Sequence, residues 1–168
     1  SDPLTVFYPG TDHHIAAVSK RTGKLTWKSA TPMGGGHTLG AGATVAGSVV
    51  VFADGFLFAF DRSTGAHKWT FAGEEGDIPG QSVPAADASQ VYSGSGSGRV
   101  FALDAETGAL VWRQEPPVTY QALALDPTVE GDQVFVGLAA VNGRRGALVA
   151  FDARLGTVLW SHDFTPYV

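Results

Sequence analysis

The stretch Ala-Leu-Asp-Ala-Glu-Thr-Gly-Ala-Leu-Val-Trp, residues 102–112, decides the fold of this chain. Its template, Ala-x-Asp-x-x-Thr-Gly-x-x-x-Trp, returns at residues 59–69, and again at residues 150–160 with leucine in place of threonine. A weaker copy at residues 17–27 has serine in place of aspartate. All four tryptophans of the protein occupy the last position of this template. The sequence is therefore built from four copies of one unit.

The spacing of the copies predicts the architecture. Successive tryptophans lie 42, 43 and 48 residues apart, which is the period of a four-stranded propeller blade. Twenty-two glycines and nine prolines favour many turns over long helices. We therefore predict an all-β fold, a β-propeller of four-stranded antiparallel blades with four repeats in a single domain over residues 1–168. The repeats span about residues 1–30, 31–72, 73–115 and 116–164, followed by the start of a strand at 165–168.

Each repeat divides into short strands with alternating apolar residues, separated by turn residues. In the third repeat we expect Leu110 and Trp112 on one face of the outermost strand. The strands predicted for the second, third and fourth repeats are 41–46, 48–53, 56–61 and 66–71; 82–86, 90–95, 99–104 and 109–114; and 127–130, 133–139, 147–152 and 157–163.

The first repeat is incomplete. It holds strands at residues 4–8, 15–18 and 24–28, and no innermost strand precedes them. The chain ends at residues 165–168, where the innermost strand of another blade would begin. A missing first strand and a spare last one are the usual means by which a propeller closes its ring.

The template residues have structural roles. Aspartate accepts hydrogen bonds from backbone donors of the following turn, glycine supplies a positive φ, and tryptophan buries a large area against a neighbour. Alanine leaves room for close packing, and we expect that room to serve the tryptophan of the next blade. We interpret these residues as structural rather than catalytic: Trp27, Trp69, Trp112, Trp160, Asp61, Asp104, Asp152, Gly23, Gly65, Gly108 and Gly156.

These eleven-residue copies resemble the tryptophan-docking motif of the quinoprotein (PQQ-type) β-propeller repeat family. The family includes PQQ-dependent alcohol dehydrogenases, the propeller lipoprotein of the outer-membrane β-barrel assembly machine, and extracytoplasmic sensor domains of some bacterial kinases. The resemblance implies a bacterial protein of the periplasmic or extracellular space. It does not select among these functions, because one fold serves many.

The resemblance to the dehydrogenases is incomplete. Those members place a vicinal cysteine pair over PQQ, with a calcium ion and a catalytic aspartate inside an eight-bladed ring. This chain has no cysteine, and none of its residues matches the calcium or aspartate positions. We therefore predict no cofactor, and PQQ with calcium is disfavoured.

Composition narrows the range of partners. The 168 residues are 44% hydrophobic and 16% charged, which argues against long disordered tails. The net charge is −5 without a cluster of lysine or arginine, so nucleic acids and anionic membranes are poor partners. No apolar run is long enough to span a bilayer.

The number of repeats is half of the family's usual eight. A half-ring would expose two apolar blade faces, which marks a binding surface or an aggregation site. Two copies pairing into an eight-bladed ring, or completion by another propeller half, are favoured over four blades that close alone as in hemopexin-type propellers.

Candidate binding residues lie on the face that carries the links between blades, which we call the loop face. His37, Gln81 and Tyr120 lead into the innermost strands near the axis, with Gln121 beside them and Tyr167 in the corresponding place at the C-terminus. They are either a binding site for a protein or small ligand, or ordinary polar residues that line a channel.

A weaker candidate is a metal site at Asp12, His13 and His14, to which His37 is a further possible ligand, because imidazole and carboxylate suit zinc or nickel. A solvated hairpin tip explains the same residues and is favoured.

Three functions follow from these features. The leading prediction is a non-catalytic scaffold or sensor that binds a protein or small ligand on the loop face. The alternatives are an enzyme that uses the propeller channel, either PQQ-like or metal-dependent, and an oligomerisation module that forms an eight-bladed ring.

Overall fold

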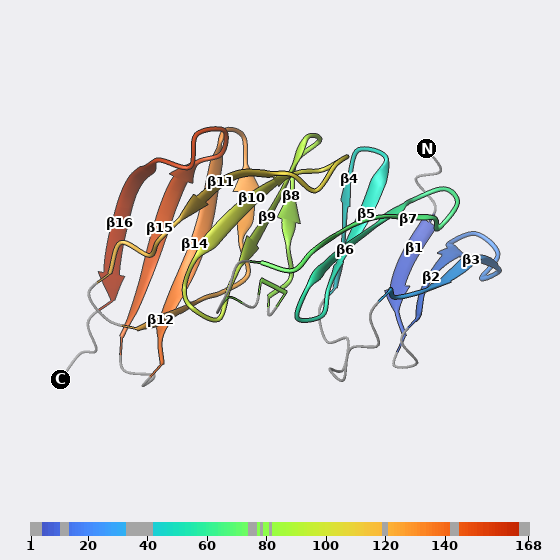
Figure 1. The fold of residues 1–168 in the computed structure, drawn as a ribbon, viewed down its shortest axis with the longest axis horizontal. Coiled ribbons are helices and arrows are strands. Elements are labelled where there is room, and N and C mark those ends of the chain that lie inside the picture. The colour runs from blue at the N-terminus through green and yellow to red at the C-terminus, as the bar shows by residue number, and fades with distance from the viewer. Residues whose placement is uncertain are drawn as a thin grey trace.

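A computed structural model describes residues 5–10, 14–32, 42–73, 77, 79–80, 82–118, 121–141 and 145–164. Every regular element in these ranges is a β-strand, and the strands form antiparallel sheets that stand side by side along the longest axis (Figure 1). The all-β propeller-type fold expected from the sequence is confirmed. Within the described ranges, no helix has the length and apolar character needed to cross a membrane.

The sheets follow the four sequence copies, and we number them as blades 1 to 4. Blade 1 has three strands, blades 2 and 3 have four, and blade 4 has five. Blade 1 holds β1 (Thr5–Pro9), β2 (His14–Ser19) and β3 (Leu25–Ala30). Blade 2 holds β4 (Ala43–Ala46), β5 (Val49–Ala53), β6 (Leu57–Asp61) and β7 (His67–Phe71). Blade 3 holds β8 (Ala85–Ala86), β9 (Gln90–Gly94), β10 (Val100–Asp104) and β11 (Leu110–Gln114). Blade 4 holds β12 (Ala122–Ala124), β13 (Thr128–Glu130), β14 (Gln133–Ala140), β15 (Gly146–Asp152) and β16 (Val158–Phe164).

The innermost strands depart most from the prediction. In blade 3 the inner strand is only β8, because Pro84 lacks an N–H and the Val83 N–H donates instead to Asp126 Oδ1 at 2.8 Å. In blade 4 the inner position is shared by two short strands, β12 and β13, which pair with the two ends of the long strand β14. Only β13 was expected from the sequence.

Each outer strand carries a β-bulge immediately before its tryptophan. In blade 3, Ala102 pairs with Trp112 while Leu103 pairs with Leu110, so Val111 is the extra residue. The same shift precedes Trp27, Trp69 and Trp160. The bulge sends Leu110 to the face opposite Trp112, so the prediction that these two side chains share a face was wrong.

The core formed by the described residues consists of three apolar clusters, one between each pair of neighbouring blades. Trp27, Trp69 and Trp112 each belong to one cluster and are only 7–8% exposed. Each template alanine pairs with the tryptophan of its own blade, as Ala102 does with Trp112. The neighbouring tryptophan lies over the turn glycine instead, which corrects the expectation that it packs against the alanine.

The same docking contact joins all three pairs of neighbouring blades. The indole N–H donates to the backbone carbonyl of the residue that follows the aspartate position of the next blade. The three bonds are Trp27 to Arg62 at 3.1 Å, Trp69 to Ala105 at 2.9 Å and Trp112 to Ala153 at 2.8 Å. A Cβ atom added at Gly65, Gly108 or Gly156 would lie 2.6 Å from the docked ring. Glycine is therefore required both for its positive φ, 71° to 75°, and for the space it leaves.

The aspartate of the template shapes the turn that receives the tryptophan. Oδ1 of Asp104 accepts the backbone N–H groups of Glu106 at 3.1 Å and Thr107 at 2.8 Å. Asp152 accepts the corresponding pair from Arg154 and Leu155. These bonds lie within the turn whose backbone carbonyl accepts the neighbouring indole N–H.

Substitution of Gly108 by alanine tests the docking contact. Gly108→Ala adds a Cβ atom 2.6 Å from Trp69, whereas Gly131→Ala adds one at a similar φ, +60° against +72°, with no atom within 4 Å. Both changes carry the strain of a positive φ, but only the first displaces a docked ring. We expect Gly108→Ala to lower the free energy of unfolding by about 1–3 kcal/mol more than Gly131→Ala, the usual range for overpacking. Urea unfolding measures the difference, and equal losses would contradict the docking account.

Candidate functional site

The loop-face residues predicted to bind ligands are mostly outside the described residues. His37, Gln81, Tyr120 and Tyr167 fall there, and so do Asp12 and His13 of the proposed metal site. Gln121 is described and exposed, and its backbone carbonyl accepts the Val141 N–H at 3.0 Å. That bond ties the link before β12 to the hairpin between β14 and β15. Both the ligand-binding set and the metal set stay predictions.

His14, the described member of the metal set, begins β2 and is half-buried. Its backbone carbonyl accepts the Gly10 N–H at 2.7 Å, so this end of the β1–β2 hairpin is held by the main chain. Within the ranges that the structure describes, no three His, Cys, Asp or Glu side chains gather in a way that could hold a metal ion.

A charged cluster that the sequence did not single out holds the loop face together between blades 2 and 3. The Asp77 side chain is fully buried, pairs with Arg99 Nη1 at 2.8 Å and accepts a hydrogen bond from the Ser97 hydroxyl. Arg99 Nε donates to Glu115 Oε1 at 2.7 Å. Hydrogen bonds to Glu115, and then to Asp77, raise the pKa of the Arg99 guanidinium. A buried carboxylate of this kind is stable only because its partners are fixed in place.

The link from β7 to β8 is anchored at further points. Gly55, in the β5–β6 hairpin, donates its N–H to the Gly80 carbonyl at 3.1 Å, and the Ser93 hydroxyl on β9 donates to the Pro79 carbonyl. Gly80 has no room for a side chain, because a Cβ there would lie 2.4 Å from the Phe56 carbonyl oxygen. This part of the loop face is therefore a preformed surface.

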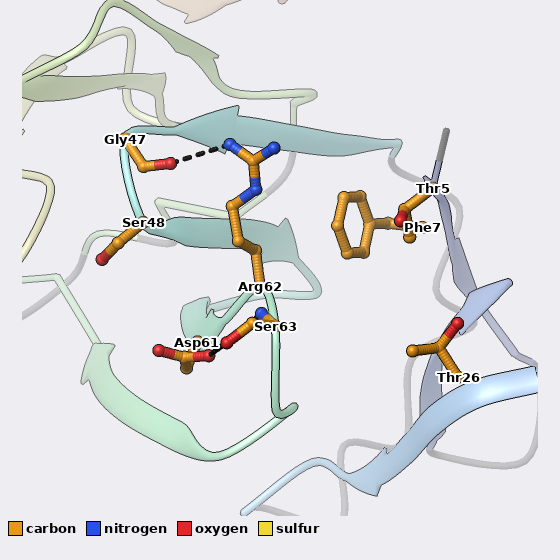
Figure 2. Close-up of a pocket in the computed structure, with 8 residues that line it drawn as sticks. All are labelled: Thr5, Phe7, Thr26, Gly47, Ser48, Asp61, Arg62 and Ser63. Atoms are coloured by element: carbon orange, nitrogen blue, oxygen red, sulfur yellow. Dashed lines mark hydrogen bonds between the residues drawn. The ribbon is translucent and has the colours of Figure 1, made fainter. Parts of the chain in front are cut away.

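A cavity of about 510 Å³ opens on the other side of the molecule, between blades 1 and 2. Figure 2 shows Phe7 and Arg62 facing each other across it, with Arg62 Nη1 donating to the Gly47 carbonyl at 2.9 Å. The lining residues come from β1, β3 and the two turns of blade 2: Thr5, Phe7, Thr26, Gly47, Ser48, Asp61, Arg62 and Ser63.

The next interface explains why this cavity exists. The positions of Thr26 and Ser63 correspond, between blades 2 and 3, to Lys68 and Glu106, which form an ion pair at 2.6 Å. Two short hydroxyl side chains leave the gap that this pair fills in the neighbouring interface. We therefore interpret the cavity as a packing gap with one guanidinium in its wall.

Asp61, at the edge of this cavity, accepts hydrogen bonds from residues of its own turn. Its Oδ1 accepts the backbone N–H and hydroxyl of both Ser63 and Thr64, at distances of 2.6–3.0 Å. The Ser63 hydroxyl, and then the Thr64 backbone N–H, lower the pKa of the Asp61 carboxyl from 3.8 to about 2. A carboxylate with so low a pKa is a poor general base near neutral pH.

Comparison with known proteins shows the family of the chain. Residues 11–78 and 53–167 match the repeat family described as outer membrane protein assembly factor BamB. The chain belongs to this family. The PQQ-like propeller repeat expected from the template is thereby confirmed, and the chain is a BamB-like propeller.

Two curated relatives carry the same description. The outer membrane protein assembly factor BamB of Vibrio cholerae is 34% identical over 116 residues, which is 66% of this chain. The BamB of Yersinia pestis is 28% identical over 163 residues, or 93% of this chain. The chain spans only 30% and 41% of the lengths of these two relatives.

Proteins other than BamB share this fold. The quinohemoprotein alcohol dehydrogenase ADHIIG from Pseudomonas putida superposes with a TM-score of 0.79 over 97% of this chain and 33% of its own length, at 21% identity. At that identity the likeness concerns the fold alone, so the site must be argued from the residues of this chain.

The Asp61 turn predicts a pH dependence. Because the carboxyl has a lower pKa in the folded chain than the ordinary 3.8, its contribution to stability is present above about pH 4 and is lost as the pH falls towards 2. In Asp61→Asn, the amide oxygen accepts the same N–H groups but does not titrate. We expect the free energy of unfolding to fall less between pH 5 and pH 2 in this variant than in the parent. Urea unfolding at several pH values measures this, and parallel curves would refute the assignment.

Proposed function

We propose that the chain is a non-catalytic propeller scaffold that binds a protein partner through its loop face. The observation that carries this proposal is the buried Asp77–Arg99 pair, which fixes the link between blades 2 and 3 with the help of Ser97 and Glu115. A surface whose loops are held before binding loses less conformational entropy when a partner docks. The curated relatives are named assembly factors, which supports a protein as the partner rather than a substrate.

The chemistry of the described loop face suits a protein surface. Val141 is 63% exposed at the end of β14, and Gln121 and Arg145 beside that hairpin are also exposed. An apolar side chain among an amide and a guanidinium provides both contact area and hydrogen bonds. His37, Gln81, Tyr120 and Tyr167 complete the proposed surface from the sequence. We propose a component of the outer-membrane protein assembly machinery as the partner.

A binding measurement tests the loop face. The full chain is titrated against the purified outer-membrane assembly complex of the organism that carries it, with biolayer interferometry as the readout. We expect the combined variant Gln81→Ala, Tyr120→Ala and Gln121→Ala to raise Kd by about tenfold or more, because aromatic contact residues carry much of the binding energy. The control is Glu130→Ala, an exposed substitution beside the β13–β14 turn at the opposite end of the blade. Equal affinity of the triple variant and the control would show that the loop face is not the site.

The second candidate function is a PQQ-dependent oxidoreductase, which a curated relative suggests: the quinohemoprotein alcohol dehydrogenase ADH IIB of Pseudomonas putida is 28% identical over 66% of this chain. The residues of this chain do not fit that cofactor as the family resemblance places it. The sequence contains no cysteine for the vicinal pair, and the described residues hold no three-ligand cluster for a calcium ion.

Incubation with PQQ and Ca²⁺ separates the two functions. After gel filtration we expect the protein fraction to carry no PQQ absorbance, because the sequence has no cysteine for the vicinal pair and the described residues hold no three-ligand group for the ion. Stoichiometric retention of the chromophore would favour the oxidoreductase and contradict the scaffold.

A further inference from the structure

The cavity between blades 1 and 2 has an aromatic side and a cationic side. On the aromatic side, the ring of Phe7 lies 5.9 Å from that of Trp27, the tryptophan docked at this interface. On the cationic side, Arg62 extends from the β6–β7 turn to the β4–β5 turn, where its Nη1 donates to the Gly47 carbonyl at 2.9 Å (Figure 2). The Trp27 indole N–H donates to the backbone carbonyl of Arg62 at 3.1 Å, so the docking contact joins the two sides.

The Arg62 side chain keeps donors for a further partner. A guanidinium carries five N–H donors in a planar fork. Within the described ranges, the Gly47 carbonyl is the one acceptor of this side chain, and no carboxylate pairs with it. Asp61 also lines the cavity, but its Oδ1 accepts the backbone N–H groups of Ser63 and Thr64. A guanidinium held at one end, with N–H groups to spare, suits the two oxygens of a carboxylate.

The next interface shows a carboxylate in the corresponding space. Between blades 2 and 3, Glu106 Oε2 lies 2.6 Å from Lys68 Nζ, and Glu106 Oε1 accepts the Ser48 hydroxyl at 2.5 Å. Between blades 1 and 2, Thr26 takes the position of the lysine and Ser63 that of the glutamate. The packing of the repeat therefore accommodates a carboxylate at this place, and blades 1 and 2 do not supply one.

The dimensions and the remaining lining fit a small molecule. The volume of about 510 Å³ falls within the range of roughly 300–1,000 Å³ that is usual for small-ligand sites. Phe7 offers an apolar surface for the body of a ligand. The hydroxyl groups of Thr5 and Thr26, which form no hydrogen bond with another described residue, are available to a polar substituent.

We propose that this cavity binds a small organic carboxylate, with its carboxylate on the Arg62 guanidinium and its apolar body against Phe7. The ligand supplies the negative group that Glu106 supplies at the next interface. The site lies on the other side of the molecule from the loop face, so it is independent of the proposed protein partner.

Titration of the full chain with phenylacetate tests the site, because this acid joins one carboxylate to a short apolar body. The ¹⁵N NMR signal of the Trp27 indole is the reporter, since its ring contacts Phe7 and its N–H bonds to Arg62. We expect a saturable shift with a Kd of about 1–10 mM, the order expected for a ligand of this size. Trp69 and Trp112 are docked in the same way at the other two interfaces, and their signals should not move.

The neutral analogue phenylacetamide separates the charge from the apolar body. It has nearly the same shape and the same ring, but it cannot form an ion pair with a guanidinium. We expect it to bind about tenfold more weakly than phenylacetate or worse, because hydrogen bonds to charged groups are the stronger ones.

Arg62→Gln tests the cation. The glutamine amide can still donate to the Gly47 carbonyl, but the charge is lost, and we expect the Kd for phenylacetate to rise about tenfold or more. The control is Arg154→Gln, which removes the same charge from an exposed position in the corresponding turn of blade 4 and should leave the Kd unchanged. Three docked indole signals at the parent positions show that each variant is folded.

The double variant Thr26→Lys with Ser63→Glu tests the cavity itself. It places the ion pair of the next interface between blades 1 and 2, in a turn that tolerates glutamate at the same position in blade 3. We expect this variant to fold and to show no saturable shift with phenylacetate, because its own side chains occupy the space.

Four results would each overturn the proposal: a Trp27 signal that does not saturate in the parent chain, indole signals that all shift alike, equal affinity for phenylacetate and phenylacetamide, or parental affinity in Arg62→Gln or in the folded double variant. The first three need no substitution, so the proposal can fail even where a variant does not fold.

Discussion

The structure depends on a single contact: an indole ring laid over a glycine, with its N–H bonded to a carbonyl of the same turn. The contact combines the burial of a large apolar surface with the satisfaction of the one polar group that the ring carries. Three copies hold four sheets in a row, at 2.8–3.1 Å from nitrogen to oxygen. Because each blade supplies a tryptophan on one side and a turn on the other, the row has a direction and two different ends.

The turn is as important as the ring. A glycine at positive φ gives the backbone its conformation and the ring its space, and the aspartate holds the loop through hydrogen bonds to the following N–H groups. Blade 1 forms the same turn without a carboxylate: the Gly23 N–H donates to the Ser19 carbonyl, and the Lys24 N–H donates to the Thr22 hydroxyl. The interfaces differ from one another outside the docking residues. Lys68 and Glu106 form an ion pair between blades 2 and 3, whereas a cavity lies at the corresponding place between blades 1 and 2.

The sequence predicted the blades because their signal is local and periodic. The template marks each turn and each outer strand, and the strand boundaries differ from the prediction by a few residues at most in blades 1 to 3. The bulge before each tryptophan was not predictable, because it is a shift of register between two strands and no particular residue type marks its position. Strand β12 was missed because Ala122–Ala124 is too short to show alternation. The Asp77–Arg99 pair joins residues from different segments, and only the folded chain brings them together. Of the predicted ligand set, Gln121 alone falls among the described residues, so the ligand site remains a prediction from the sequence.

The docking contact can be followed through the indole proton that each docked tryptophan donates. The direct test of the docking account is the exchange of the indole protons, followed by ¹⁵N NMR on the four tryptophans. The account predicts slow exchange for Trp27, Trp69 and Trp112, whose indole N–H groups are bonded to the next blade, and faster exchange for Trp160, which is 43% exposed. Exchange at any of the three internal indoles as fast as at Trp160 would contradict it.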